Sequence, residues 1–203
     1  MNPTFLFTLG FAFLFVITTP ALASNHVVDW KGDPLKVGVL YDMWAVGQDR
    51  GPIAIGRGSF PLNTRYVISK PNSDSSNPDP VTFSSTSSSE KWVRLGQDYT
   101  IRFGSSTSPS DCWQVAGILP PRNFITVNKL LLCNTLGSKF QFTLVDEGEH
   151  LYKLTTVAAA LIIPRRMDVN SVWKDGEDRL CVNQGSEIKF RFVEHKPLIQ
   201  QVV

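Results

Sequence analysis

Short segments in which apolar and polar residues alternate run through most of the chain. A period of two places successive side chains on opposite faces of an extended segment, as in a half-buried strand. Gly, Pro, Ser, Asn and Asp interrupt these segments about every ten residues, and no window of about 12 residues keeps the 3.6-residue period of a helix. The pattern predicts an all-β domain, built as a barrel or a sandwich. The predicted strands are residues 37–46, 53–55, 66–69, 81–83, 92–95, 99–103, 113–116, 130–133, 140–145, 151–156, 167–169, 180–182 and 188–193.

One stretch, residues 81–103, combines two alternating segments with a serine-rich run between them. The run consists of Ser84, Ser85, Thr86, Ser87, Ser88 and Ser89. Ser and Thr hydroxyls bond to their own backbone and bury little apolar area, so the run is predicted to be a surface loop held at both ends by strands. Such a loop is a candidate binding element. A solvated connection without a function fits the same features, and this alternative stays open at this point.

The N-terminal region has the pattern of a secretory signal peptide. Residues 5–16 are almost wholly apolar, and Ala21-Leu22-Ala23 supplies a small-residue cleavage site, although no Lys or Arg precedes the apolar core. Removal of residues 1–23 would leave residues 24–203 as one domain. No second apolar stretch of about 18 residues follows, so we expect no membrane partner after cleavage. The destination would be extracellular or vacuolar.

Composition and motifs exclude several classes of function. The formal net charge is +2, with 19% charged residues, and the only adjacent basic pair after the leader, Arg165-Arg166, is isolated, so no nucleic-acid partner is expected. G-x-S-x-G, H-E-x-x-H, C-x-x-C and Gly-rich phosphate motifs do not occur. His26, His150 and His195 lie far apart, which indicates surface histidines rather than a metal site. We therefore expect neither an enzyme nor a cofactor.

The order of several short motifs carries a family resemblance. Residues 28–35 read V-D-W-K-G-D-P-L, and Gly38 and Tyr41 follow. Further fragments occur at residues 60–62, 81–84, 99–103, 112–115, 151–154, 175–180 and 188–192. Together these fragments resemble the plant Kunitz-type proteins of the soybean trypsin inhibitor family. The resemblance covers nearly the whole chain after the leader.

The resemblance implies a β-trefoil of three four-stranded repeats, with a six-stranded barrel and a hairpin cap. Segments 40–44, 99–103 and 139–144 are similar to one another at spacings of roughly 40 to 60 residues, which agrees with three repeats. The family's usual activity is inhibition of serine proteases, and in some members of cysteine or aspartic proteases. The inhibitory loop lies between the fourth and fifth strands. In this chain that position falls on the serine-rich run followed by Glu90 and Lys91.

The cysteines depart from the family pattern, which usually has two disulfides. Phe60 stands where the first cysteine would be, and Val157 stands near the place of the third. The chain has three cysteines, Cys112, Cys133 and Cys181, so at most one internal disulfide can form. Two alternatives remain: one bridge with a spare thiol, or buried thiols that behave as small apolar residues. In either case at least one thiol is free in the monomer, which is the oligomeric state that we expect.

The loop and its support also differ from the family. Asp33 replaces an asparagine that braces the loop, and an ionised carboxylate accepts hydrogen bonds but cannot donate them. We therefore expect the packing of Phe83 and Trp92, at the two ends of the loop, to hold it.

Specificity stays open at this stage. If the target is trypsin, the sequence predicts that Lys91 enters its acidic pocket, although Glu90 beside it is unfavourable there. A target with a small or neutral pocket would engage Ser88 or Ser89. The alternative function is a non-inhibitory trefoil with a storage, carbohydrate- or pigment-binding, signalling, defence or stress role, although the Q-x-W repeats of ricin-type sugar-binding trefoils do not occur.

Overall fold

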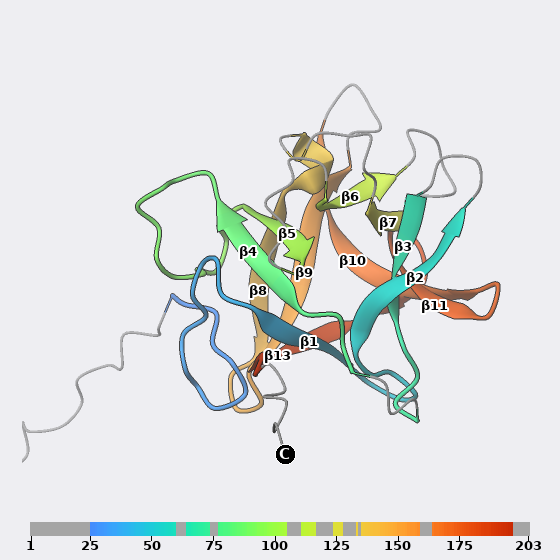
Figure 1. The fold of residues 1–203 in the computed structure, drawn as a ribbon, viewed down its shortest axis with the longest axis horizontal. Coiled ribbons are helices and arrows are strands. Elements are labelled where there is room, and N and C mark those ends of the chain that lie inside the picture. The colour runs from blue at the N-terminus through green and yellow to red at the C-terminus, as the bar shows by residue number, and fades with distance from the viewer. Residues whose placement is uncertain are drawn as a thin grey trace, which may run out of the picture.

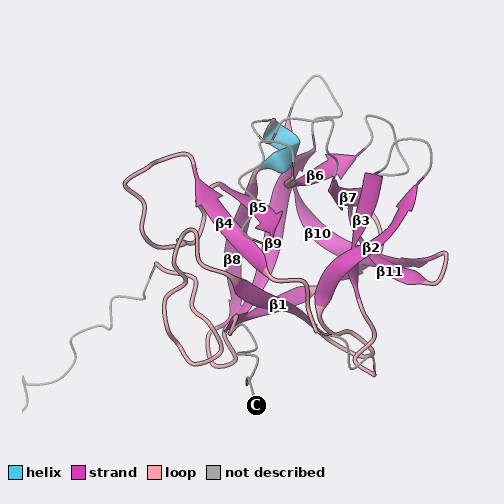
Figure 2. Cartoon of the chain, viewed as in Figure 1, coloured by secondary structure: helices cyan, strands magenta, loops and turns pink. Residues whose placement is uncertain are grey.

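The computed structural model describes residues 25–59, 64–73, 77–104, 111–116, 124–127, 133, 135–158 and 164–196. In this part of the chain the regular elements are β-strands, apart from the short 3-10 turn η2 (Leu136–Ser138), as Figure 1 and Figure 2 show. The predicted signal peptide lies outside the described residues, and its removal stays a prediction.

Six strands pair antiparallel in a closed ring, in the order β13, β1, β4, β5, β8 and β9, and β9 returns to β13. The ring strands are β1 (Tyr41–Val46), β4 (Val81–Ser85), β5 (Tyr99–Phe103), β8 (Phe140–Asp146), β9 (Leu151–Ala158) and β13 (Lys189–Glu194). Extended pairings join β13 to β1, β4 to β5 and β8 to β9. A single residue pair joins the strands at each of the other three contacts. This alternation gives the ring a threefold repetition.

Three hairpins lie beside the ring and pair with one another. They are β2 (Ile53–Ser59) with β3 (Thr64–Ser69), β6 (Trp113–Ala116) with β7 (Phe124–Val127), and β10 (Arg165–Lys174) with β11 (Glu177–Val182). Strands β3, β7 and β11 pair in all three combinations, and the two-residue β12 (Ser186–Glu187) adds to β10. Each third of the chain supplies a ring strand, a hairpin and a second ring strand. The fold is therefore the predicted β-trefoil.

The repetition is also visible in a tyrosine at the start of β1, β5 and β9, the first strand of each repeat. Tyr41 and Tyr99 begin β1 and β5, Tyr152 is the second residue of β9, and all three are buried. The Tyr41 hydroxyl accepts the Lys36 N–H at 2.8 Å, and the Tyr99 hydroxyl accepts the Arg94 N–H at 2.8 Å. Both donors lie five residues before the tyrosine. The Tyr152 hydroxyl likewise accepts a backbone N–H, that of Val28, at 2.9 Å. Of the three similar sequence segments, 40–44 and 99–103 therefore lie at corresponding places in the repeats, whereas 139–144 forms β8, the last strand of the second repeat.

Three phenylalanines, one from each repeat, meet in the centre of the core. The ring centroids of Phe83, Phe142 and Phe192 lie 5.4 Å, 5.5 Å and 5.7 Å apart, and each pair is nearly perpendicular. All three side chains are fully buried. Edge-to-face pairs of this kind add to the free energy gained by burying the rings. The residue that precedes the serine-rich run, Phe83, is thus anchored in the centre of the molecule.

Several predicted strands differ from the observed ones. The expected strand 37–46 begins only at Tyr41, because residues 37–38 form a turn in which Gly38 has φ +81°. Residues 92–95 make isolated bridges rather than a strand. Of the expected strand 130–133, residues 130–132 lie outside the described residues and Cys133 lies in a turn. β7 was not predicted from the sequence, because all four of its residues are buried and no apolar–polar alternation marks them.

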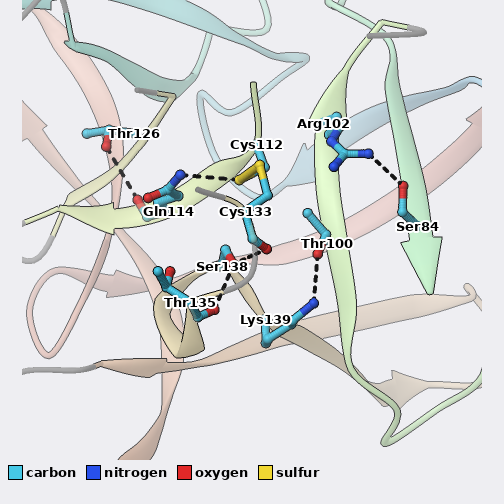
Figure 3. The surroundings of a disulfide bond; sticks show 10 residues. All are labelled: Ser84, Thr100, Arg102, Cys112, Gln114, Thr126, Cys133, Thr135, Ser138 and Lys139. Carbon is cyan, nitrogen blue, oxygen red and sulfur yellow. Dashed lines mark hydrogen bonds between the residues drawn. A yellow bond between two sulfur atoms is a disulfide. The ribbon is translucent and has the colours of Figure 1, made fainter. Parts of the chain in front are cut away.

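Cys112 and Cys133 form a disulfide, with Cα atoms 5.7 Å apart, and Cys181 is a buried free thiol (Figure 3). Cys112 directly precedes β6, and the Cys133 carbonyl accepts a hydrogen bond from the Ser138 hydroxyl of η2. The bridge therefore ties the β6 hairpin to the segment that leads into β8. This resolves the two alternatives left by the sequence in favour of one bridge and one spare thiol.

The Cys181 thiol is expected to be unreactive in the native protein. Burial raises its pKa to about 12, and nearby Asp178 adds to that shift. Since the thiolate is the reactive species, native protein at neutral pH should react only very slowly with iodoacetamide. Unfolded, unreduced monomer should take up one alkyl group, which mass spectrometry detects. Rapid labelling of native Cys181, or more than one group after unfolding, would contradict the assigned pairing and burial.

Candidate functional site

The loop after β4 is the candidate site, and it is shorter than the sequence predicted. Ser84 and Ser85 are the last two residues of β4, paired with Thr100 and Tyr99. The Ser84 hydroxyl also accepts a hydrogen bond from Arg102 Nη1 at 3.2 Å. The connection itself begins at Thr86, and in Figure 1 it projects from the left side of the ring as the green loop.

The tip of the loop consists of four exposed residues, Thr86, Ser87, Ser88 and Ser89. The Ser85 hydroxyl accepts the Ser87 N–H at 3.1 Å, and the Ser87 and Ser89 hydroxyls lie 3.0 Å apart. The Glu90 N–H donates to the Ser87 carbonyl at 3.3 Å, which closes a turn with Ser88 and Ser89 at its centre. Among the described residues, no hydrogen bond reaches the carbonyl of Ser88 or of Ser89.

Glu90 marks the point where the exposed tip ends and the fixed part of the loop begins. Its carboxylate is mostly buried and lies 3.0 Å from Arg94 Nε. The two buried atoms are not aligned as a hydrogen bond, so the contact is an ion pair. Glu90 therefore points toward the protein, and it does not extend the exposed tip as its position in the sequence suggested.

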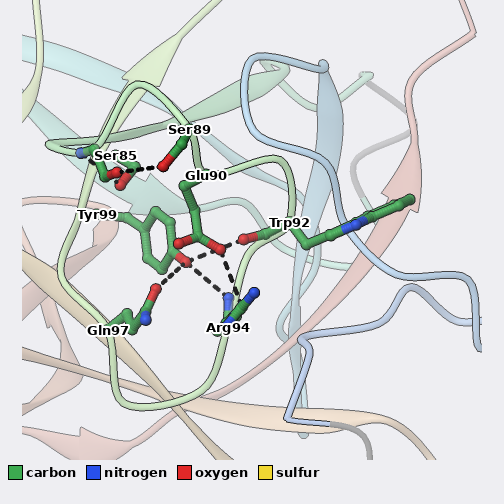
Figure 4. A network of polar contacts seen from close by, with 8 residues as sticks. Ser85, Ser89, Glu90, Trp92, Arg94, Gln97 and Tyr99 are labelled. Carbon is green, nitrogen blue, oxygen red and sulfur yellow. Dashed lines mark hydrogen bonds and ion pairs between the residues drawn. The ribbon is translucent and has the colours of Figure 1, made fainter.

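The Tyr99 hydroxyl is the centre of a network beneath the loop (Figure 4). It accepts the Arg94 N–H at 2.8 Å and lies 3.2 Å from the Trp92 carbonyl, to which it donates. The Gln97 amide oxygen lies 3.1 Å from the same hydroxyl. Burial raises the pKa of Tyr99, and the Glu90 charge adds to the shift, so the hydroxyl stays protonated at neutral pH. One side chain thus holds the segment from Trp92 to Gln97 in place.

A cycle of backbone hydrogen bonds joins the far end of the loop to the N-terminal segment. Val27 N–H donates to the Val93 carbonyl, Val93 N–H to the Leu35 carbonyl, and Leu35 N–H to the Val27 carbonyl, each at 2.8 Å. All three side chains are fully buried. The segment after the loop is therefore clamped between two parts of the N-terminal segment. Since these are main-chain bonds, no side-chain motif in the sequence marks them.

Both ends of the loop receive an additional bond from the turn at residues 37–38. The Gly38 N–H donates to the Phe83 carbonyl at 2.9 Å, and the Val37 N–H donates to the Lys91 carbonyl at 3.0 Å. The Lys91 side chain is exposed, but its carbonyl is engaged at the base of the loop. The same turn thus spans the two ends and fixes the width of the loop.

The expected supports behave differently from one another. Phe83 is anchored in the core, as predicted. The Trp92 indole points away from the Tyr99 network (Figure 4) and contacts the N-terminal segment, with the Lys36 ammonium 5.7 Å from its ring centroid. Asp33 and Trp92 line one cavity of about 330 Å³. Among the described residues, no hydrogen bond joins the Asp33 carboxylate to the loop, so backbone bonds take over the bracing expected at this position.

Removing the Tyr99 hydroxyl should loosen the loop without removing the ring from the core. Tyr99→Phe leaves the Arg94 N–H without its partner, which is expected to cost about 1–3 kcal/mol of unfolding free energy. Chemical denaturation measures this loss. As a control, Tyr66→Phe should change little, because the Tyr66 hydroxyl has no hydrogen-bond partner among the described residues. Equal stability of Tyr99→Phe and the native protein would contradict the role assigned to this network.

The described residues around the loop form a candidate binding element. Within the described ranges, no group of three or more His, Cys, Asp or Glu side chains is arranged to hold a metal ion. In the same part of the chain, no helix has the length and hydrophobicity of a membrane span.

The site consists of a narrow exposed tip on a base that is fixed by core packing, an ion pair and backbone hydrogen bonds. Such an arrangement suits insertion into the cleft of a partner.

Comparison with known proteins identifies the family. Residues 27–194 match the Kunitz family described as trypsin and protease inhibitors. The chain therefore belongs to the plant Kunitz-type inhibitor family, as the sequence motifs predicted. Members of this family are protease inhibitors and not enzymes. Among curated protein sequences there is no significant match.

Solved structures with the same fold include proteins of different activity. A Kunitz-type cysteine protease inhibitor from potato has 23% identity, a TM-score of 0.66 and coverage of 84% of this chain and 97% of that chain. Soybean trypsin inhibitor in complex with porcine pancreatic trypsin has 19% identity, a TM-score of 0.66 and coverage of 84% and 99%. A water-soluble chlorophyll protein from Brassica oleracea var. Botrytis has 17% identity, a TM-score of 0.66 and coverage of 85% and 99%. At these identities the likeness concerns the fold alone.

Proposed function

We propose that the protein is a secreted inhibitor of serine endopeptidases and that the loop from Ser84 to Lys91 enters the active-site cleft of its target. The observation that carries the proposal is the contrast between the exposed tip and the fixed base of this loop. A loop that is already held in place loses less conformational entropy on binding than a flexible peptide does. Membership of an inhibitor family supports the same activity.

The accessibility of the loop carbonyls supports a choice of the residue that would face the protease. A serine protease binds the carbonyl oxygen of the bond it attacks in its oxyanion hole, so that oxygen must be accessible. The Lys91 carbonyl is engaged by the Val37 N–H, whereas the carbonyls of Ser88 and Ser89 have no partner among the described residues. We therefore propose Ser88 or Ser89 as the residue that enters the specificity pocket. This favours a target with a small or neutral pocket over trypsin.

The turn closed by the Glu90 N–H must open for the tip to become extended. This bond, at 3.3 Å, is longer than the 2.8 Å bonds at the base. The tip can therefore adjust while the base stays fixed. The second candidate function is that of a trefoil that binds another partner and does not inhibit proteases. The closed turn favours it, because the tip is not in the extended form that a protease cleft requires.

Secretion is supported by the disulfide between Cys112 and Cys133, since such bridges form and persist in oxidising compartments. The predicted leader, residues 1–23, agrees with this destination. N-terminal sequencing of protein recovered from the medium of expressing cells should give Ser24 as the first residue. A mature protein that retains residues 5–16 would exclude the proposed cleavage.

The function is tested with a panel of proteases and mature, refolded protein as a monomer. We expect inhibition of an elastase-type serine protease to be stronger than that of trypsin, papain or pepsin. Lys91→Ala should leave every inhibition constant nearly unchanged, because the Lys91 side chain lies outside the tip. A large loss of trypsin inhibition in Lys91→Ala would show that Lys91 fills the pocket instead. Inhibition of papain or pepsin alone would refute the serine specificity, and no inhibition at all would favour the second candidate.

A further inference from the structure

A second cavity, of about 280 Å³, lies where the β10–β11 hairpin meets the turn between β1 and β2. The side chains that line it include Gln48, Arg50, Ser171, Trp173, Asp178 and Ser186. Figure 1 places the β10–β11 hairpin on the side of the molecule opposite to the loop after β4. A ligand in this cavity would therefore not compete with a protease at the loop.

The register of the strands places aromatic and polar side chains on one face at this cavity. Trp173 of β10 pairs with Asp178 of β11, which pairs in turn with Ser69 of β3. Residues directly opposite each other project to the same face of a sheet. Ser171 lies two residues before Trp173 on β10 and therefore shares that face, and Ser186 of β12 is its partner. The result is an indole beside a row of hydroxyl and carboxylate groups.

Trp173 is the most exposed large apolar side chain in the described part of the chain, at 64%. An exposed indole face attracts ligands that combine an apolar surface with polar edges. At about 280 Å³ the cavity is just smaller than the usual ligand site of about 300–1,000 Å³, so it suits a ligand of one or two rings.

The charged groups at the cavity are largely committed to each other. Asp178 Oδ2 accepts the Ser171 hydroxyl at 3.0 Å and lies 3.6 Å from Arg50 Nε. Arg50 Nη1 donates to the Glu187 carbonyl. Among the described residues, Asp178 Oδ1 and Arg50 Nη2 have no hydrogen-bond partner. The cavity therefore offers one acceptor and one donor side by side, with no net positive charge to select an anion.

We propose that this cavity binds a neutral sugar residue, with its C–H face on the Trp173 indole and its hydroxyls on Asp178 and Arg50. A hydroxyl group donates and accepts at the same atom, which matches the free acceptor and donor. An ammonium ligand could use Asp178 but would leave the donors of Arg50 and Gln48 without an acceptor. The proposal is independent of protease inhibition, since it uses a different face of the molecule.

The test uses the mature protein and methyl glycosides of glucose, mannose and galactose, together with N-acetylglucosamine. Ligand-observed NMR and tryptophan fluorescence should detect at least one of them, with a Kd on the order of 1 mM, a modest affinity for a single small ligand. Trp173→Ala should weaken that binding by tenfold or more, by roughly 1.4 kcal/mol, without changing the melting temperature or the inhibition constant.

Trp30→Ala is the matched control, because Trp30 is also about half exposed, at 52%, but does not line this cavity. It should bind the sugar as the native protein does. The proposal is overturned if none of the sugars binds at about 10 mM, far above the expected Kd. Unchanged binding in Trp173→Ala, or binding of spermidine in place of the sugars, would overturn it as well.

Discussion

Replacing Ser89 by arginine is expected to turn the protein into a much stronger inhibitor of trypsin. Ser89 is exposed, its carbonyl has no hydrogen-bond partner among the described residues, and the next residue, Glu90, is held by its ion pair with Arg94. An arginine at this position can reach the acidic specificity pocket of trypsin from a base that does not move. Close charge pairs across an interface have coupling energies of about 1.5–7 kcal/mol, so affinity should rise by about tenfold or more. The inhibition constants of the native protein and of Ser89→Arg for trypsin, measured at two salt concentrations, test this rise in affinity.

Two further variants separate insertion into the pocket from simple charge attraction. Thr86→Arg adds the same charge to the same loop, at the other end of the tip, and should gain little. Ser88→Arg shows which of the two central residues enters the pocket. If Thr86→Arg gains as much as Ser89→Arg, the effect is electrostatic steering and the proposed insertion is wrong. If no arginine variant inhibits trypsin, the tip does not enter its cleft.

Phe83→Ala is expected to be the most destabilising single change at the base of the loop. The side chain is fully buried and makes edge-to-face contacts with Phe142 and Phe192. Losing a buried phenylalanine costs about 3–5 kcal/mol of unfolding free energy, through lost burial and the cavity that remains. Since the Phe83 carbonyl also accepts the Gly38 N–H, movement of this residue should weaken inhibition even under conditions where the protein is folded. Urea denaturation and inhibition assays at low temperature measure the two effects.

Phe190→Ala supplies the control for that experiment. Phe190 is equally buried, in β13, but it is not at the loop. It should lose a similar free energy of unfolding and keep its inhibition constant while folded. Equal loss of inhibition in both variants would mean that general stability, and not the position of Phe83, supports the loop.

The sequence predicted the fold through features that are local and repeated. Alternating segments such as residues 99–103 and 113–116 match β5 and β6 in both bounds. The motif fragments led to the correct family because they occur in the right order along most of the chain. β7 was not predicted, since a strand that is buried at every position shows no apolar–polar alternation with a period of two. Which cysteines form the disulfide could not be predicted either, because the pairing of three cysteines depends on distances that a sequence does not contain.

The candidate loop was located from the sequence, but its support was not. The serine-rich run indicated an exposed tip, and Thr86 to Ser89 form that tip. The backbone bonds of Val27, Leu35 and Val93 could not be predicted, because any residue type can form them. Glu90 and Arg94 are four residues apart, a spacing that marks ion pairs on helices, and here they pair within a segment that is not helical. The role of Tyr99 was hidden because its place in an alternating segment already explained it as a core residue.

The most direct test of the central claim compares the mature protein with a variant in which Thr86, Ser87, Ser88 and Ser89 are all replaced by glycine. This change removes the side chains of the tip and leaves β4, Glu90 and the backbone bonds at the base in place. Both proteins are titrated against the same elastase-type serine protease, and their melting temperatures are compared. The account predicts that the native protein inhibits and that the variant, with a nearly unchanged melting temperature, inhibits at least about 100-fold more weakly, a loss of about 2.7 kcal/mol. Equal inhibition by the two proteins would contradict it.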